Sequence, residues 1–498
     1  MPVVPDAAGR GPARGTKAGV PSIQINLDNH YSSKVYTSGS FVSGHVAVEP
    51  PRDIPFDSFE ISFTGIVATR LDFVQSYTTN AIRTFLKLRM PIPESVIPSS
   101  RVFQAGQKVT IPFHFVVPHQ LTIGACNHGS DTPDLVKDQH LRLPPTMGYW
   151  DADDQAPDMT HIEYAIRAKA VRGSSPGNQR APVMEGKKVI KVLAATPEDP
   201  PLDITPKDER YCMSKTKTLR KNLLSTKMGD LKVSSSEPGS VILSGDGAGA
   251  SSTCARVDLE FAPATAEQAP PKINSIQGKI VTTTFFGSTP QNALPNFGSK
   301  DNYATNGILT YSGTHNLFNS RLEKVTWTEE HLPMSRRDSG YSTLGTPGEE
   351  CADSDEDGGY FAQGGSKSKS KKSQGPPIRH RSQLEIPVTI PVSNKRIFLP
   401  TFHSCLISRT YTLQLTLSVG LTNTTFTLNV PLQLGVEQRY EPEGDALPSF
   451  ENALAEAEAQ AADSYWQPRL IQHPPPSTRQ HSILPGYNEI SGQFVPVA

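Results

Sequence analysis

Apolar and polar residues alternate with a period of two along much of this chain, and no other feature restricts its fold as strongly. The pattern is clearest at 109–117, 162–170, 411–419 and 426–434, with weaker versions at 23–27, 42–48, 59–63, 256–261, 276–285 and 386–392. Successive side chains of a strand point to opposite faces, so these segments suit antiparallel sheets with one face on a core. Many short strands separated by turn residues predict β-sandwiches. Three prolines within strands, Pro112, Pro387 and Pro431, are expected at sheet edges or bulges, because proline cannot donate to the ladder.

Helical signal is weak by comparison. The best stretch is the Ala- and Glu-rich segment 451–462, and 214–230 is a candidate basic helix with a thin apolar stripe. Hydrophobic residues make up only 36% of the chain, against about 45–50% in a compact globular protein. We therefore expect folded β-rich modules separated by disordered polar segments.

Charge, apolar runs and cysteines restrict the class of protein. The net charge is −1, which argues against a globally basic nucleic-acid binder. No apolar run approaches the roughly 18 residues that a membrane span needs, and the N-terminus lacks a run of signal-peptide type. The five cysteines are odd in number and widely spaced, which argues against a disulfide framework and for a reducing compartment. The sequence therefore predicts a cytoplasmic or nuclear protein.

Motifs for metal binding and catalysis are incomplete. The segment DSDEDG at 353–358 copies the opening of a calcium loop, but Gly364 stands where the loop needs a glutamate. Cys126 and His128 offer two zinc ligands, but no second pair follows at finger-like spacing, so no metal is expected. An acidic run with one histidine fits a solvated loop better than a cation site: Asp151, Asp153, Asp154, Asp158 and His161. Because no P-loop or G-x-G-x-x-G motif occurs, we expect no enzyme, although a triad assembled in space stays open.

Two kinds of short motif suggest regulation. A basic stretch is a candidate for contact with anionic lipid headgroups, each cation contributing about 1 kcal/mol, the alternative being a solvated strand or linker. Its first members are Lys215, Lys217, Arg220 and Lys221. Ser339 and Ser382 each follow arginines, as substrates of basophilic kinases do. Phosphorylation would add about −1.5 to −2 charge and could recruit a phosphoserine-binding partner.

The C-terminal tail carries a peptide motif. Leu484, Pro485 and Tyr487 fit the L/P-P-x-Y pattern that WW domains bind. The proline favours the polyproline II conformation, which costs little entropy on docking, and the tyrosine ring would fill a second pocket. A weaker copy, without the tyrosine hydroxyl, consists of Leu447, Pro448 and Phe450.

Further motifs point to a family. The first β-rich region contains Y-T-S-G at 36–39, G-H-V-A-V at 44–48 and I-S-F-T-G at 61–65. The second contains I-P at 386–387, S-R-T-Y at 408–411 and L-N-V-P-L-Q-L-G at 428–435. Through these motifs residues 22–438, apart from an insert, resemble arrestin-like proteins of the α-arrestin type, most closely the fungal members.

The resemblance implies an all-β arrestin fold of two tandem immunoglobulin-like β-sandwich domains. These are expected at 22–197 and 217–438, joined by a linker at 198–216. Disordered segments are expected at 1–21, at about 334–381 inside the second domain, and at 439–498, the tail that carries the PY-type motifs. A long insert at about 290–381, which includes the expected disordered segment, departs from the compact pattern of the family.

The resemblance also implies an adaptor with no enzymatic activity and no cofactor. Such proteins bind cytoplasmic tails or loops of membrane transporters or receptors. Their PY motif recruits a HECT-type ubiquitin ligase through its WW domains, and the ubiquitinated cargo is endocytosed. The protein is then expected in the cytoplasm, recruited to the plasma membrane and endosomes.

Two other readings stay open at this point. One is an arrestin-fold trafficking or signalling scaffold that acts without a ligase, which a requirement for Tyr487 would separate from the adaptor. The other is an enzyme or sugar-binding β-sandwich, which a pocket with converging polar groups would favour.

Overall fold

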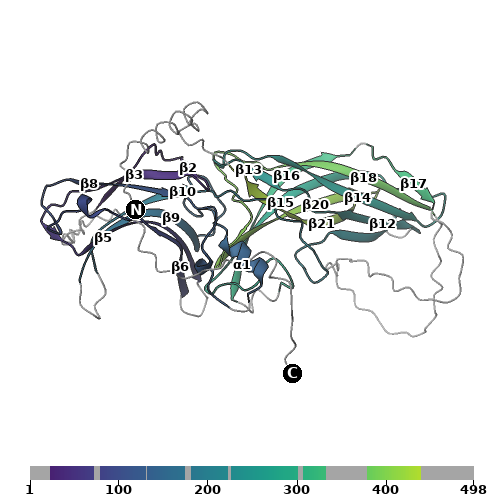
Figure 1. The fold of residues 1–498 in the computed structure, drawn as a ribbon. Coiled ribbons are helices and arrows are strands. Elements are labelled where there is room, and N and C mark those ends of the chain that lie inside the picture. The colour runs from purple at the N-terminus through teal and green to yellow at the C-terminus, as the bar shows by residue number, and fades with distance from the viewer. Residues whose placement is uncertain are drawn as a thin grey trace, which may run out of the picture. The chain divides into compact units, whose positions relative to one another are not determined.

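The computed structural model describes residues 23–71, 79–129, 132–173, 181–221, 226–300, 307–322, 324–331 and 378–438. These residues confirm the expected all-β fold, and they belong to one compact unit (Figure 1). Within the described residues, no helix is long and apolar enough to cross a membrane. Cys212 forms a disulfide, whereas Cys126, Cys254 and Cys405 are free thiols. Because one described cysteine is disulfide-bonded and three are free thiols, the thiol states do not decide the redox compartment, and the reducing compartment stays a prediction.

The first half of the chain contains two main sheets. One has three strands: β1 (Gln24–Leu27), β3 (Phe41–Val48) and β8 (Val109–Val116). The other has five strands: β2 (Val35–Tyr36), β5 (Ser58–Leu71), β6 (Thr79–Arg89), β9 (Thr160–Arg172) and β10 (Ala181–Val192). Their orders are β1-β3-β8 and β2-β10-β9-β5-β6, antiparallel except for the parallel pair β2 and β10. A small additional pair consists of β4 (Ile54–Pro55) and β7 (Val102–Phe103).

Alternation along β8 shows how these sheets enclose a core. Residues 111, 113, 115 and 117 are buried, whereas residues 110, 112, 114 and 116 are exposed. Phe115 of β8 lies against Phe63 of β5, with ring centroids 6.0 Å apart, so the two sheets face each other across apolar side chains. Pro112 lies on β8, an edge strand of its sheet, as predicted from its missing N–H.

The second half repeats this arrangement with longer strands. One sheet is formed by β11 (Ser214–Arg220), β12 (Lys227–Ser235), β14 (Ser252–Pro263), β17 (Thr328–His331) and β18 (Ile378–Thr389). The other is formed by β15 (Ile273–Gly287), β16 (Ile308–Arg321), β19 (Phe402–His403), β20 (Ile407–Val419) and β21 (Thr424–Leu432). The orders are β11-β12-β14-β18-β17 and β16-β15-β20-β19, with β21 also paired to β20. A parallel pair joins β13 (Val241–Leu243) to β22 (Leu434–Val436).

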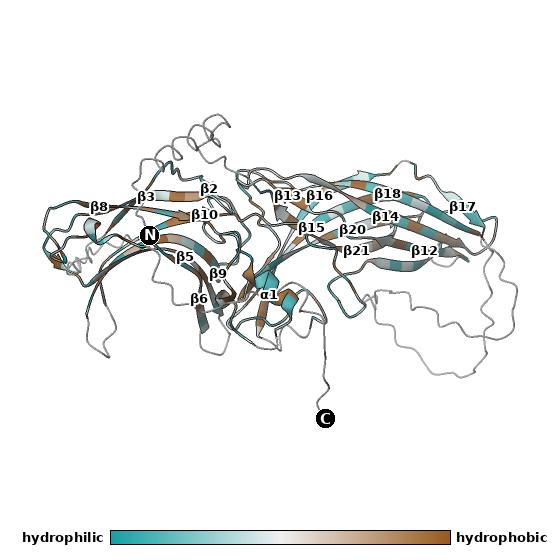
Figure 2. Cartoon of the chain, in the orientation of Figure 1, coloured by the Kyte–Doolittle hydropathy of each residue, from teal (hydrophilic) through white to brown (hydrophobic). Residues whose placement is uncertain are grey.

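The hairpin of β20 and β21 supplies much of the second core. Its inward residues are buried completely or nearly so: Tyr411, Leu413, Leu415, Leu417, Val419, Phe426, Leu428, Val430 and Leu432. Gly420 and Asn423 take positive φ values of 71° and 51° in the connecting turn, which both residue types tolerate. Brown and teal residues alternate along the strands of this half in Figure 2.

A buried tyrosine occurs at a similar place in each half. Tyr164 on β9 donates its hydroxyl to the carbonyl oxygen of Pro144 at 2.6 Å, and Tyr411 on β20 donates to Leu399 at 2.6 Å. Burial raises the pKa of Tyr411 to about 12 and also raises that of Tyr164, so both stay protonated donors. A buried tyrosine bonded to an upstream carbonyl is a known feature of β-sandwich corners.

Helices are short among the described residues, and one helical prediction is wrong. The helical elements are α1 (Asp134–Leu141) and the 3₁₀ turns η1 (Glu94–Val96) and η2 (Ile123–Ala125). The candidate basic helix at 214–230 is instead part of the antiparallel pair of β11 and β12, because cross-strand pairing outweighs a thin apolar stripe. The other candidate, 451–462, lies outside the described residues.

The predicted boundaries differ from the structure at two places. β11 begins at Ser214, inside the segment expected to be a linker. β18 begins at Ile378, so the last residues of the expected insert belong to a strand paired with β14 and β17. In both cases the residues are polar and carry little strand signal of their own, and they form a strand because they pair with a neighbouring strand.

Candidate functional site

A buried arginine joins the two halves. Arg409 of β20 is fully buried. Its Nε and Nη2 donate to Thr284 Oγ1 of β15 at 3.1 and 3.0 Å. Its Nη1 donates to the carbonyl of Asp154, and its Nη2 donates to that of Gln155 at 2.9 Å. One guanidinium therefore holds a loop of the first half against two strands of the second half.

The acidic run of the first half forms this loop. Asp154 accepts the N–H of Gly148 at 2.6 Å, and Asp151 accepts from Lys191 at 2.5 Å. The carboxylate of Asp153 accepts from the backbone of the same loop at 2.9 Å. These carboxylates have different partners and do not converge, in agreement with the loop interpretation and not with a cation site.

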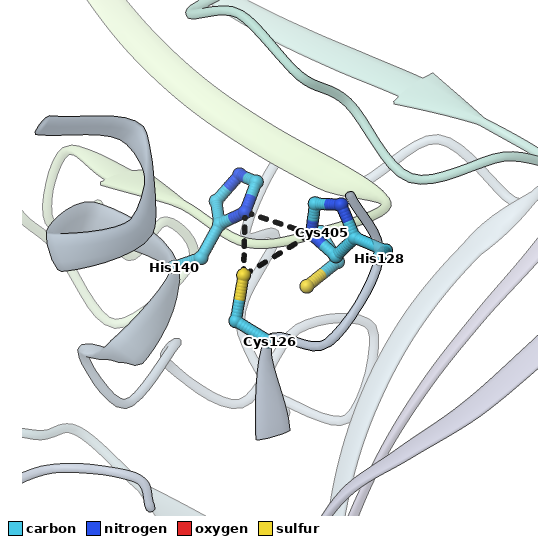
Figure 3. Close-up of side chains that lie close together, drawn as sticks. All are labelled: Cys126, His128, His140 and Cys405. Carbon is cyan, nitrogen blue, oxygen red and sulfur yellow. Dashed lines mark hydrogen bonds between the residues drawn. The ribbon is translucent and has the colours of Figure 1, made fainter. Parts of the chain in front are cut away.

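The segment between β19 and β20 also takes part in a second contact with the first half. Cys405 lies there and is buried. Cys126 directly follows η2, His128 comes two residues later, and His140 lies on the last turn of α1. The four donor atoms, two thiol sulfurs and two imidazole nitrogens, all lie within 4.8 Å of one another. We call these four residues the Cys/His cluster (Figure 3).

Distances inside the Cys/His cluster are short. His128 Nε2 lies 3.2 Å from His140 Nδ1. Cys126 Sγ lies 3.2 Å from His128 Nε2 and 3.5 Å from His140 Nδ1. Figure 3 shows the side chains of Cys126, His128 and His140 pointing toward one another, with the sulfur of Cys405 beside them. Among the described residues, this is the one group whose donor atoms are close enough to hold a metal ion together.

The surroundings of the cluster set its protonation. Burial lowers the pKa of His140 to about 3, with a smaller contribution from His128. Burial also lowers the pKa of His128, although a bond to Asn292 opposes this shift. Both imidazoles are therefore neutral at pH 7, and each has one nitrogen with a free lone pair. Burial raises the pKa of the Cys405 thiol to about 12.

The sequence names only two members of this cluster. Cys126 and His128 are possible zinc ligands there, but the missing second pair at finger-like spacing predicts no metal. The structure supplies that pair from His140, twelve residues after His128, and from Cys405 in the second half. A search at the spacing of a zinc finger misses both residues, since the pair is not local in the chain. His140 lies on α1 and Cys405 lies between β19 and β20, so no sequence spacing relates them to Cys126 and His128.

A cavity of about 310 Å³ lies close to the cluster. It is lined from both halves by side chains that include Leu135, Gln139, Phe297, Tyr411 and Leu432. Next to it, Arg142 donates two bonds to the carboxylate of Asp199, at 2.7 and 2.8 Å. The region between the sandwiches therefore combines an apolar hollow with fixed polar contacts.

The four candidate lipid-contacting cations lie at β11 and directly after it. Lys215 is paired with Val233, and Lys217 with Leu231, and both of these partners are fully buried. Directly opposed residues share a sheet face, so these two lysines lie on the core side of the pair. Arg220 and Lys221 are exposed at its end, after a bulge. The four cations therefore do not form one exposed face, and lipid contact stays a prediction.

Ser382 lies in β18 opposite Leu259 of β14, and not in a loop. Its upstream arginines are engaged, since Arg379 forms an ion pair with Glu260. Arg381 lies 3.0 Å from Glu330. Ser382 also lines a hollow of about 460 Å³ on this sheet. A kinase would have to draw this strand out of its sheet, which makes Ser382 a poorer candidate than the sequence suggested.

The remaining predicted positions lie outside the described residues. These are Ser339 and the two tail motifs, formed by Leu447, Pro448 and Phe450 and by Leu484, Pro485 and Tyr487. The calcium-like segment 353–358 lies outside them as well. The tail is therefore judged on its sequence alone.

Comparisons with known proteins do not identify the chain. No protein-family model matches it, and no curated protein matches it either. The class that the fold defines is thus an all-β protein built from β-sandwiches. Any narrower assignment depends on the motifs and contacts described above.

Proposed function

We propose that this chain is an arrestin-like adaptor that links plasma-membrane transporters or receptors to a WW-domain HECT ubiquitin ligase. The observation that carries the proposal is the tail motif of Leu484, Pro485 and Tyr487. In this proposal the adaptor works in the cytoplasm and is recruited to the plasma membrane and endosomes, where its cargo is ubiquitinated and endocytosed.

The described fold supports this proposal in two ways. Rigid sandwiches with exposed loops suit binding surfaces for the cytoplasmic tails or loops of cargo. In addition, the family-like motifs occupy places where their residues are required. Gly44 is one example, because a Cβ there would lie 2.1 Å from the carbonyl oxygen of Asn26. Arg409, within the S-R-T-Y motif, is another, since it joins the halves.

The tail motif gives the proposal its mechanism. A ligase bound to a tail tethered to the sandwiches stays at high effective concentration near any cargo that the sandwiches hold. With one full motif and one copy that ends in Phe450, the chain lacks the avidity of two equal sites. Recruitment should therefore depend strongly on Tyr487.

The test combines a direct binding assay with a cellular one. Loss of the aromatic anchor of a short motif typically costs about 2 kcal/mol, or roughly 30-fold in Kd. We expect Tyr487→Ala in the full chain to weaken binding to a purified WW domain by that factor. We also expect it to abolish co-purification of a HECT ligase and cargo ubiquitination. The matched control is Tyr465→Ala, a tail tyrosine that no proline precedes at motif spacing.

Two outcomes would contradict the proposal. If wild type and Tyr487→Ala bind the WW domain equally weakly, the tail motif is a chance match. If ligase binding is lost but cargo endocytosis is unchanged, the chain acts as a trafficking or signalling scaffold without a ligase. If wild type and Tyr487→Ala capture the ligase equally well, another segment recruits it. The weaker copy at 447–450 would then be tested with Phe450→Ala.

A further inference from the structure

The Cys/His cluster has the dimensions of a metal site. Zinc bound by nitrogen at about 2.0–2.1 Å and by sulfur at about 2.3 Å places tetrahedral donors roughly 3.3–3.8 Å apart. In the structure the separations among Cys126, His128 and His140 are 3.2, 3.2 and 3.5 Å. The sulfur of Cys405 completes a group that fits within 4.8 Å. A small contraction or expansion would accommodate an ion at the centre.

Hydrogen bonding alone does not account for this convergence. A ring nitrogen of neutral imidazole has either one hydrogen or one lone pair in the ring plane. His128 Nε2 nevertheless lies at hydrogen-bonding distance from both Cys126 Sγ and His140 Nδ1, and His140 Nδ1 faces two partners as well. A central cation would use one lone pair from every donor at the same time.

We infer that Cys126, His128, His140 and Cys405 bind one zinc ion in a tetrahedral site, a property independent of the proposed adaptor function. Two thiolates and two imidazoles are the ligand set of structural zinc sites, and the group contains none of the carboxylates that calcium and magnesium prefer. A bound cation deprotonates coordinating thiols, which overcomes the effect of burial on Cys405. With four protein ligands, the site leaves no open position for catalysis.

A residue outside the ligand set supports this assignment. Asn292 Oδ1 lies 3.3 Å from His128 Nδ1, and Thr132 Oγ1 donates to the same oxygen at 3.4 Å. A carbonyl oxygen only accepts, so it selects the tautomer of His128 that carries its hydrogen on Nδ1. That tautomer leaves the Nε2 lone pair directed at the cluster. Metal-binding histidines usually have such a partner on the second nitrogen.

The ion would link distant parts of the chain. Cys126, His128 and His140 come from one short region of the first half, and Cys405 comes from the corner between β19 and β20 in the second. Because such a site does not exist in the unfolded chain, metal binding contributes to folding. The zinc would therefore act as a cross-link between the sandwiches.

Metal analysis of the full-length protein tests this inference. We expect one zinc per chain after purification with added zinc and removal of free metal. His140→Ala and Cys405→Ser should each reduce this content to near zero. The matched control is Cys254→Ser, which removes an exposed free thiol on β14 and should keep one zinc per chain. Circular dichroism establishes that each variant retains its β-structure.

Cobalt substitution tests the geometry of the site directly. Metal-free wild type with one equivalent of Co²⁺ should show the visible bands of a tetrahedral ion and a thiolate charge-transfer band. Asn292→Ala should keep these bands while metal affinity falls roughly 10–100-fold. A folded wild type that binds neither ion, or Cys405→Ser with unchanged zinc content, would overturn the inference. A Cys126–Cys405 disulfide in freshly purified protein, in place of metal, would overturn it too.

Discussion

Replacement of Arg409 by methionine tests whether the buried guanidinium holds the two sandwiches together. Methionine keeps most of the aliphatic volume of the side chain, so the change removes mainly the charge and its hydrogen bonds. The carbonyl oxygens of Asp154 and Gln155 would lose the donors that now reach them. Thr284 Oγ1 would lose two more donor contacts.

The size of the effect follows from these contacts. A buried backbone carbonyl left without its donor costs about 1–3 kcal/mol, so two carbonyls cost about 2–6 kcal/mol. A buried methionine avoids the free-energy cost of desolvating a guanidinium charge, and this gain offsets part of the cost of the two unpaired carbonyls. Removal of a buried charge is near neutral only when its partners are replaced as well, and backbone carbonyls cannot be replaced. We therefore expect Arg409→Met to lower the free energy of unfolding by about 2–4 kcal/mol.

Urea denaturation followed by tryptophan fluorescence measures this change. Trp150 is a suitable reporter, because its indole donates to Thr146 at 2.7 Å, close to the loop that Arg409 holds. The control is Arg256→Met, because the Arg256 side chain is 58% exposed and forms an ion pair with Asp258. Exposed pairs contribute about 0–1 kcal/mol. If both variants fall within 0.5 kcal/mol of wild type, a range typical of surface changes, Arg409 does not stabilise the junction.

Two further predictions concern the first sandwich. Burial alone would raise the pKa of Glu163, but hydrogen bonds from Lys187 and Tyr149 and the charges of Lys187 and Arg167 outweigh burial and lower that pKa below the ordinary 4.5. The carboxylate therefore stabilises the fold above pH 4.5 and loses this effect as the pH falls through its lowered pKa. Glu163→Gln should cost about 1–2 kcal/mol at pH 7, and its thermal melts should approach those of wild type below pH 4.5, whereas a gap constant down to pH 3 would contradict this cause. Gly44→Ala should lower stability by about 1–3 kcal/mol, because β1 must shift away from the new methyl group. Gly124→Ala, with no atom within 4 Å of the new Cβ, is the control for the same melts, and equal melting of both variants would refute the close-packing argument.

The strands could be predicted because their signal is local. At 411–419 every second side chain enters the core, and this periodicity is visible without knowledge of the partner strand. The segment 214–230, for which the sequence suggests a helix, lacks such a local signal. Its lysines and threonines carry little local signal, and the choice between helix and strand is made by pairing with β14 through β12. The start of β18 at Ile378 also depends on neighbouring strands.

The contacts between the halves could not be predicted in this way. Arg409 and Cys405 are four positions apart around the start of β20, and both contact parts of the first half that precede β9 in the chain. In the sequence Arg409 is one polar residue between Ser408 and Thr410, and Cys405 is an isolated cysteine, so neither residue indicates a distant partner. Only the fold shows that this corner holds a guanidinium for two carbonyls and contributes a sulfur to the Cys/His cluster. Since both contacts join the same corner to the first sandwich, we infer that the two halves act as one platform. In the adaptor function proposed above, a cargo surface that spans both sandwiches would then depend on residues that never touch the cargo.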